Sequence, residues 1–345
     1  MNAVIQAIEY YLPEKVVSNQ DLAAEFPDWP VEKIQGKTGI HERHIASTQE
    51  TSSDLAFQAA QKLFASGACS PAEVDYLLLC TQSPDYFLPT TACILQDRLG
   101  ISTHAGALDF NLGCSGFVYG LGLAQGLIQT GQASTVLLIM AETYSKFIHP
   151  RDKSVRTLFG DAAAATLLKA SSDEAVPRTG AYIFGTDGKG GPNLIVPAGG
   201  MRQPASPDTA HVVSDDNGNQ RSLDNLYMNG PEIFNFTLKA IPDCVARLLG
   251  RTQLTLPDID MFVFHQANQY MLEHLRKKLR IPDEKFLINL SACGNTVSST
   301  IPIALKDAWE QKRLRNGHKA MLVGFGVGYS WGATLVEWPL LGLSA

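Results

Sequence analysis

The chain has 345 residues, of which 45% are hydrophobic and 18% are charged. This length is enough for one large or two medium domains, and the composition excludes an intrinsically disordered chain. The net charge is -6, and neither half of the sequence is strongly basic. We therefore expect a globular protein that has no nucleic-acid partner.

The N-terminal residues and the cysteines indicate where the protein works. Residues 1–9 have no basic start followed by a long apolar core, so no signal peptide is expected. No run reaches the ~18 apolar residues of a membrane span. The cysteines are scattered, without a Cys-X-X-Cys pair, at Cys69, Cys80, Cys93, Cys114, Cys244 and Cys293. Reduced thiols in the cytoplasm, no membrane contact and no metal site are the expectation.

The hydrophobic pattern predicts alternating strands and helices in the first half. The short apolar runs are typical of strands covered on both faces. The predicted strands are residues 3–9, 74–80, 107–112 and 134–140, and residues 157–169 are small and apolar. Helices are predicted over residues 19–25, 51–66, 91–99 and 117–130, and residues 37–45 read as a basic loop leading into an extended segment.

The second half contains a change of composition and then an internal echo of the first half. Residues 197–226 have loop composition and predict an exposed excursion, ahead of a helix from residue 230 to about residue 249. Residues 256–268 resemble residues 71–83, and the offset between Asp260 and Asp75 is 260 − 75 = 185. This offset is too long for a solenoid, whose period is about 20–50 residues, and it favours a duplicated α/β unit.

The duplication predicts two halves, residues 1–172 and 173–345. We expect a pseudo-twofold axis to relate them and the chemistry to lie where they meet.

Cys114 lies at the predicted break between a strand and a helix. There the unpaired N–H groups and the helix dipole favour a thiolate, so we expect a lowered thiol pKa and a nucleophile at neutral pH. Gly113 and Gly116 allow a sharp turn and the close approach of a substrate. The alternative is a small buried cysteine in a packed turn.

Three features of the second half are further candidates. His265 follows a buried strand, at a place where ligands bind in α/β sheets. Asn295 lies in residues 291–296, the counterpart of the Cys114 turn. Residues 324–332 are glycine-rich but lead into a strand, which excludes a dinucleotide fingerprint and allows N–H groups to face an oxyanion. The alternatives are a core histidine, a plain Gly-Asn turn and a tight β-turn.

Together these motifs resemble the 3-oxoacyl-[acyl-carrier-protein] synthase III family. Cys114 in Asn-Leu-Gly-Cys-Ser-Gly, His265 in His-Gln-Ala-Asn and Asn295 in Gly-Asn-Thr resemble its Cys-His-Asn triad. Other motifs occur in the family's order, namely those at residues 37–45, 159–161, 228–234 and 326–332. The resemblance implies a thiolase-like α/β fold, with two pseudo-twofold-related halves in a five-layered αβαβα arrangement, and a homodimer.

The resemblance also implies a reaction. Cys114 would take an acyl group from acyl-coenzyme A or an acyl-carrier protein, and its own N–H and one from the Gly326–Gly328 turn would stabilise the oxyanion. Malonyl-carrier protein would then lose CO2, and neutral His265 and Asn295 would donate hydrogen bonds to the enolate. The product is a 3-oxoacyl thioester, and no metal or redox cofactor is needed.

Substrate and carrier contacts follow from the same resemblance. The implied substrate-binding residues are Lys37, Leu88, Lys153, Asn268, Phe325, Gly326 and Gly328. Arg276, Lys277 and Lys278 match the helix that docks the acidic carrier protein, although an ordinary solvated face is the alternative.

Several positions depart from the family. Lys33 stands where housekeeping members stack a tryptophan on the adenine, and Trp29 is out of register. Lys37 and Lys153 replace arginines and lack their planar fork, and Tyr270 replaces a docking arginine. Leu88 cannot act as a base, which favours decarboxylative chemistry.

Two other functions remain open from the sequence. One is an acyltransferase that moves the acyl group from Cys114 to an alcohol or amine, and the other is a silent subunit of a heterodimer. The complete triad argues mildly against the first and strongly against the second. The acyl chain and its carrier are left open.

Overall fold

The computed structural model describes residues 1–172 and 179–338, in which two five-stranded sheets form the framework. The first sheet has the order β1 (Asn2–Tyr11), β7 (Ala162–Ser171), β6 (Thr135–Glu142), β4 (Tyr76–Cys80) and β5 (Gly106–Phe110). The second has the order β8 (Thr179–Thr186), β16 (Ser330–Glu337), β15 (Lys319–Gly326), β13 (Met261–Phe264) and β14 (Phe286–Leu287).

The two sheets repeat one another strand by strand. β4 pairs in parallel with β5 and β6, as β13 does with β14 and β15, and the remaining pairs are antiparallel in both sheets. Asp75 accepts the N–H of Thr135 at 2.9 Å, and Asp260 accepts that of Lys319 at 2.8 Å. The sequence echo therefore reflects equivalent positions in two similar sheets.

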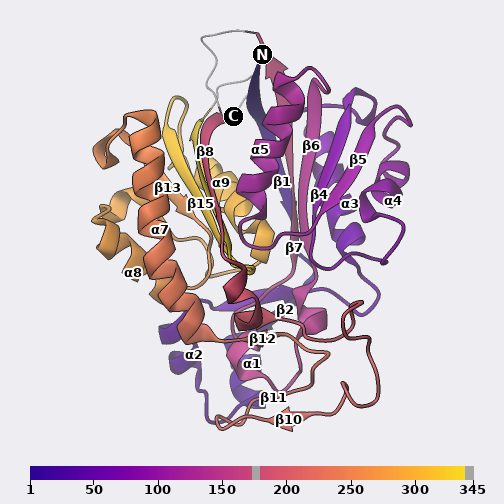
Figure 1. Cartoon of the computed structure of the whole chain (residues 1–345), viewed down its shortest axis with the longest axis vertical. Coiled ribbons are helices and arrows are strands. Elements are labelled where there is room, and N and C mark those ends of the chain that lie inside the picture. Colours follow the sequence, from indigo (N-terminus) through magenta and orange to yellow (C-terminus); the bar gives the residue numbers. More distant parts are fainter. Residues whose placement is uncertain (173–178, 339–345) are drawn as a thin grey trace.

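Helices separate and cover the sheets in five layers (Figure 1). On the first sheet's outer face lie α3 (Ser52–Ala65) and α4 (Thr91–Arg98), and between the sheets lie α5 (Gly116–Gln129) and α9 (Thr300–Glu310). α7 (Gly230–Thr252) and α8 (Gln269–Leu279) cover the second sheet. The αβαβα arrangement predicted from the resemblance is confirmed.

The apolar runs at residues 74–80 and 134–140 are largely buried as predicted, whereas the run at residues 107–112 forms the edge strand β5, in which Leu108 is 42% exposed. All eight residues of β6 are buried, because helices cover both faces of its sheet. The predicted helices from residues 51 and 91 are confirmed to within one or two residues. The first begins at a capping box, in which Thr51 and Asp54 exchange hydrogen bonds.

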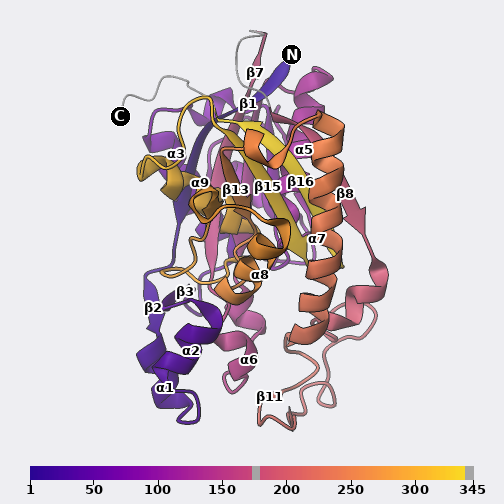
Figure 2. The same ribbon diagram turned by 90° about the vertical axis from the view of Figure 1, so that its left-hand side faces the viewer.

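A smaller region lies below the layers in both views (Figures 1 and 2). It contains the antiparallel pair β2 (Lys15–Ser18) and β3 (Glu42–Ile45), with α1 (Asn19–Glu25), α2 (Val31–Thr38) and α6 (Lys153–Arg156). The prediction that a loop begins at residue 37 is wrong, because Lys37 lies in the last turn of α2. Gly39, with a φ of 72°, ends that helix in a left-handed cap.

Over residues 197–226, where the sequence predicts an excursion, the chain is largely irregular. It contains the short strands β10 (Val213–Ser214) and β11 (Gln220–Arg221), and it is flanked by β9 (Leu194–Ile195) and β12 (Tyr227–Met228). Arg221 anchors it through ion pairs of 2.7 Å to each of Asp152 and Asp215. The short 3-10 segments of the described chain are η1 (Pro71–Glu73), η2 (Tyr144–Phe147), η3 (Gly188–Asn193), η4 (Leu256–Asp258), η5 (Asp283–Lys285) and η6 (Val297–Ser299).

The boundary proposed between the halves lies at the edge of residues 173–178, which are outside the described residues, so it stays a prediction. The first sheet uses strands up to residue 171, and the second uses strands from residue 179 onward. Of the helices in residues 1–172 and 179–338, none combines the length and apolar character needed to cross a bilayer.

Candidate active site

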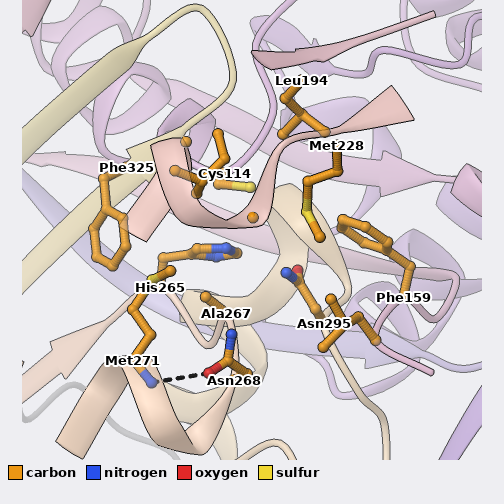
Figure 3. A pocket seen from close by; sticks show the side chains of 14 residues that line it. Cys114, Phe159, Leu194, Met228, His265, Ala267, Asn268, Met271, Asn295 and Phe325 are labelled. Atoms are coloured by element: carbon orange, nitrogen blue, oxygen red, sulfur yellow. Dashed lines mark hydrogen bonds between the residues drawn. The ribbon is translucent and has the colours of Figure 1, made fainter. Parts of the chain in front are cut away.

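The three predicted catalytic residues line one cavity of about 80 Å³, here called the catalytic pocket (Figure 3). Cys114 lies between β5 and α5, His265 follows β13, and Asn295 precedes η6. The two halves of the chain thus each contribute a turn to the same pocket. Other residues in its lining are Phe159, Leu194, Met228, Asn268, Phe325 and Gly326.

The turn between β15 and β16 closes over the sulfur of Cys114. A Cβ on Gly326 would lie 2.8 Å from Cys114 Cβ and 2.9 Å from its Sγ, so only glycine allows this approach. The backbone N–H groups of Cys114 and Val327 lie close enough to the thiol sulfur to lower its pKa. Two such donors beside a nucleophile are suited to stabilising an oxyanion.

The thiol itself differs from the sequence-based expectation. Burial raises the pKa of Cys114 to about 12, and the charge of nearby Glu142 adds to this, while the two N–H groups act in the opposite direction. The expectation of a lowered thiol pKa is therefore wrong: desolvation outweighs the donors and the helix start. The resting group is a neutral thiol, which needs a base when it attacks.

His265 is a buried, neutral imidazole. Its backbone N–H donates to Val323 O at 2.8 Å, which fixes it at the end of β13. Its Nδ1 lies 2.8 Å from the hydroxyl oxygen of Thr300, so its Nε2 is the nitrogen left for the pocket. Burial lowers the pKa of His265 to about 3. The neutral state expected from the sequence is thus the stable one at neutral pH.

Asn295 is oriented so that it can donate into the pocket. Its Oδ1 accepts the N–H of Val297 at 2.9 Å, which leaves the Nδ2 hydrogens for the pocket. Its backbone pairs with the strand-like chain around Phe159, through Asn295 N to Leu158 O at 2.9 Å and Gly160 N to Asn295 O at 3.0 Å. The amide is therefore held by the first half of the chain.

Val297 connects the two polar groups of the second half. Its N–H holds Asn295, and its carbonyl accepts the hydroxyl of Thr300 at 3.1 Å, the same hydroxyl that contacts His265. Val297 has a φ of 56°, which is rare for a β-branched residue and costs about 1–3 kcal/mol. The backbone of Val297 therefore positions both side chains.

Three of the predicted substrate-binding residues line the pocket, namely Asn268, Phe325 and Gly326. Asn268 caps α8, and its Oδ1 accepts the N–H of Met271 at 2.8 Å, so its Nδ2 is left to donate (Figure 3). Phe325 packs edge-on against His265, with 5.5 Å between ring centres. Gly328 lies in the turn beyond Gly326 but does not line the pocket.

The two predicted lysines lie together outside the pocket lining. Lys37 Nζ is 5.0 Å from the ring centre of Trp29, as is Lys33 Nζ. Lys153 Nζ is 2.6 Å from a carboxylate oxygen of Asp28, beside Trp29 in the chain. Trp29, which precedes α2, thus shares one surface with both predicted lysines, Lys37 on α2 and Lys153 on α6.

The remaining predicted contacts are on the surface. Leu88 is 81% exposed and lies away from the catalytic pocket. Arg276 is ion-paired with Glu273 at 2.8 Å and Asp283 at 3.4 Å. Lys277 and Lys278 are exposed on α8. The two lysines are therefore more available to an acidic partner than Arg276.

Sequence reasoning missed Glu142, which is buried at the end of β6. It accepts hydrogen bonds from Gln82 N at 3.0 Å and from Ser298 Oγ at 3.0 Å, which joins the two halves. Burial raises the pKa of Glu142 to about 8. Thr300 was also missed, because its role depends on a contact 35 residues away that no local pattern reveals.

Residues 1–172 and 179–338 contain no group of three or more His, Cys, Asp or Glu residues placed to hold a metal ion.

Comparisons with known proteins decide the family. Residues 108–188 match the model of 3-oxoacyl-[acyl-carrier-protein] synthase III, and residues 249–338 match the model of its C-terminal part. The chain is 38% identical to beta-ketoacyl-[acyl-carrier-protein] synthase III of Caldanaerobacter subterraneus subsp. tengcongensis, over 95% of each protein. The chain belongs to the 3-oxoacyl-[acyl-carrier-protein] synthase III family.

Solved structures of synthases of this family agree with the fold. A crystal structure of a 3-oxoacyl-(acyl-carrier-protein) synthase III, 55% identical, has a TM-score of 0.96 over 98% of this chain and all of that one. The crystal structure of the 3-oxoacyl-(acyl-carrier protein) synthase from Burkholderia xenovorans LB400 is 37% identical in sequence. It has a TM-score of 0.90 and covers 98% of this chain and 95% of that one.

Proposed function

We propose that this synthase III family member joins an acyl group on Cys114 to the malonyl group of malonyl-carrier protein, with loss of CO2, to form a 3-oxoacyl thioester. The observation that carries the proposal is the convergence of a thiol, an imidazole and an amide on one pocket, with two backbone N–H groups beside the sulfur. The names of the relatives agree with this activity.

In the first step the Cys114 sulfur attacks the thioester carbonyl of the acyl donor. A carbon–sulfur bond forms, the carbonyl oxygen becomes an oxyanion facing the N–H groups of Cys114 and Val327, and the donor's thiolate leaves. Because the thiol pKa is raised, the proton needs an acceptor. The Nε2 of neutral His265 takes it and returns it to the leaving thiolate.

In the second step the malonyl thioester loses CO2 and leaves an enolate. Its oxygen requires donors, which Asn295 Nδ2 and the Nε2–H form of His265 supply. The enolate carbon attacks the acyl-cysteine carbonyl, and the bond to sulfur breaks. The Cys114 thiolate takes up a proton from solvent, and the 3-oxoacyl thioester leaves. The proposed chemistry uses these side chains and needs no metal or redox cofactor.

The second candidate is transfer of the acyl group from Cys114 to an alcohol or amine. The orientation of Asn295 favours condensation, because its free Nδ2 hydrogens serve an enolate and are not required for simple transfer. The two reactions differ in whether the malonyl donor consumes the acyl-enzyme.

Mass spectrometry of the Cys114 peptide tests the proposal. The protein is incubated with acyl-coenzyme A or acyl-carrier protein and then with malonyl-carrier protein. We expect a mass gain on Cys114 that disappears with release of CO2 and of a 3-oxoacyl product. In the variant Asn295→Ala, Cys114 should still be acylated, and the reaction of the acyl-enzyme with malonyl-carrier protein should become slower. Acylation of Cys114→Ala at another residue would overturn the nucleophile, and consumption only by alcohols or amines would favour acyl transfer.

We also propose a homodimer that works in the cytoplasm. The exposed apolar residues Tyr86, Phe87 and Leu88 form one run, and β5 is an edge strand with Leu108 42% exposed. Monomers rarely expose such a surface beside a free sheet edge.

The free cysteines of the described chain are suited to a reducing compartment. Lys277 and Lys278 are the proposed carrier contacts.

A further inference from the structure

Two buried serine hydroxyls join the turn that carries the nucleophile to the turn that faces it. Ser115 directly follows Cys114, and Ser330 is the first residue of β16. Their Oγ atoms are 2.6 Å apart, and the two side chains are 0% and 4% exposed. Because the two serines are 215 positions apart in the sequence, this hydrogen bond connects the two halves of the chain next to the reacting cysteine.

The hydroxyl of Ser115 does not serve the helix that it precedes. Ser115 is the N-cap residue of α5, a position where a serine side chain commonly accepts an N–H of the first helical turn. Here the side chain makes no capping hydrogen bond, and its hydroxyl contacts Ser330 instead. Helix capping therefore does not account for this serine.

The hydroxyl of Ser330 in turn binds the backbone of Val327. Gly326 and Ser330 pair across β15 and β16, so Val327 lies in the short turn between them. Ser330 Oγ donates to Val327 O at 3.0 Å, and this bond uses its single hydrogen. Ser115 is therefore the donor to Ser330. The hydrogen bonds run from Ser115 through Ser330 to Val327.

The same turn also touches the two residues before Ser115. A Cβ on Gly113 would lie 2.8 Å from Val327 Cγ1, and a Cβ on Gly326 would lie 2.8 Å from Cys114 Cβ. These contacts limit how closely the turn approaches, but they do not orient its peptide groups. The hydrogen bonds of the serines are directional and can do so.

The orientation of Val327 matters because it carries one of the two backbone N–H groups beside the thiol sulfur. Its carbonyl, which Ser330 holds, belongs to the same residue, so the bond restricts how far the N–H can turn away. Packing alone gives less support here, since Val327 is only partly buried and Gly328 is exposed.

Resting on the proposed acylation of Cys114, we propose that Ser115 and Ser330 are positioning residues that aim the N–H of Val327 at the oxyanion. Neither serine lines the catalytic pocket, so both act through Val327. A donor that already points at the developing charge needs no reorganisation during the reaction, which is the source of its effect on the rate.

Two reactions of Cys114 distinguish the aim of this N–H from a general disturbance of the cysteine. Acylation by an acyl-coenzyme A develops an oxyanion, whereas alkylation by iodoacetamide replaces iodide on carbon and does not. Both rates depend on the position and ionisation of the same sulfur, so their ratio reports on the oxyanion. The rates are followed by the mass of the Cys114 peptide, with the acyl-coenzyme A that labels the wild type.

We expect the ratio of acylation to alkylation to fall about tenfold in Ser330→Ala, the effect of one net hydrogen bond. The donor concentration that gives half the maximal acylation rate should not change, because Ser330 does not line the pocket. Ser330→Thr keeps the hydroxyl and should keep the ratio. Ser222→Ala removes another buried serine hydroxyl, which bonds to Asn225 Oδ1 at 2.9 Å, and is the matched control with an unchanged ratio.

A double variant tests whether the serines act in series. Ser115→Ala should lower the ratio less than Ser330→Ala, because Ser330 still reaches Val327. The double variant should be no worse than Ser330→Ala alone, since Ser115 acts only through Ser330.

An unchanged ratio in Ser330→Ala, with or without a fall in both rates, would overturn the inference. Losses of the two single variants that multiply in the double variant would also overturn it. A wild type that iodoacetamide labels at Cys114 and that no acyl donor labels would overturn the proposed function, and this inference with it.

Discussion

The Nδ1 atom of His265 lies 2.8 Å from the hydroxyl oxygen of Thr300. This hydroxyl has one hydrogen and two neighbours that can accept it, His265 Nδ1 and Val297 O. When it donates to Val297, His265 must be protonated on Nδ1, and Nε2 can take the thiol proton. When it donates to His265, Nε2 carries the hydrogen and can serve the enolate. Thr300 therefore permits both forms that the proposed reaction uses.

Replacement of Thr300 tests its part in positioning His265. Thr300→Val keeps the shape but leaves Nδ1 without a partner, so we expect kcat for condensation to fall about tenfold, the effect of one hydrogen bond. KM for the acyl donor should change little, because Thr300 does not line the pocket. Thr300→Ser restores the hydroxyl and should restore the rate. A loss shared equally by the serine variant would indicate a packing effect instead.

Gly326→Ala tests how closely the turn must approach the nucleophile. The new Cβ would lie 2.8 Å from Cys114 Cβ, so the sulfur must move away from the N–H groups that face it. We expect acylation, followed by mass, to slow about 100-fold, since displacements near 1 Å have such effects.

Gly126→Ala is the matched control for this variant. Gly126 lies within α5, and a Cβ there meets nothing within 4 Å. Its acylation rate should equal that of the wild type, and its unfolding free energy should rise by about 0.5–1 kcal/mol. Normal acylation of Gly326→Ala would contradict the proposed geometry.

The fold was predictable because its signals are local and repeated. The run from Val74 to Cys80 and its echo before His265 each read as a buried strand, and the aspartates that anchor them, Asp75 and Asp260, have the same role in both halves. Cys114, His265 and Asn295 follow such strands or occupy equivalent turns. Their convergence followed from the symmetry and from the family resemblance.

What the sequence could not reveal depends on contacts between distant residues. The raised pKa of Cys114 comes from burial and from Glu142, and neither is visible in the Cys114 motif. Hydrogen bonds join Tyr144 to Gln82 and Gln82 to Asn111, which no periodicity connects. Arg276 resembles a free basic residue in the sequence, but its charge is already paired with Glu273 and Asp283.

Glu142 should make stability fall as the pH rises. Its pKa of about 8 in the folded state lies above the ordinary glutamate value of 4.5, so the folded state holds a proton that the unfolded state releases. The stability that Glu142 contributes to the folded state is complete below about pH 4.5 and is lost between about pH 4.5 and 8. Glu142→Gln imitates the protonated form. We expect this variant to exceed the wild type in unfolding free energy by a few kcal/mol at pH 8.5, and much less at pH 5. Urea unfolding at both pH values measures this, and a difference that is constant with pH would exclude the assignment.

The exposed run at Phe87 and Leu88 should hold two copies of the chain together. The two side chains are 79% and 81% exposed, and their loop lies near the edge strand β5, whose Asp109 accepts the N–H of Thr91. Light scattering should give the wild type twice the 37.4 kDa chain mass, and the double variant Phe87→Glu, Leu88→Glu should give a single chain. Val213→Glu changes a residue that is 56% exposed on β10 and should remain dimeric. A wild type that runs as one chain, or a double variant that stays paired, would show that this surface does not form the interface.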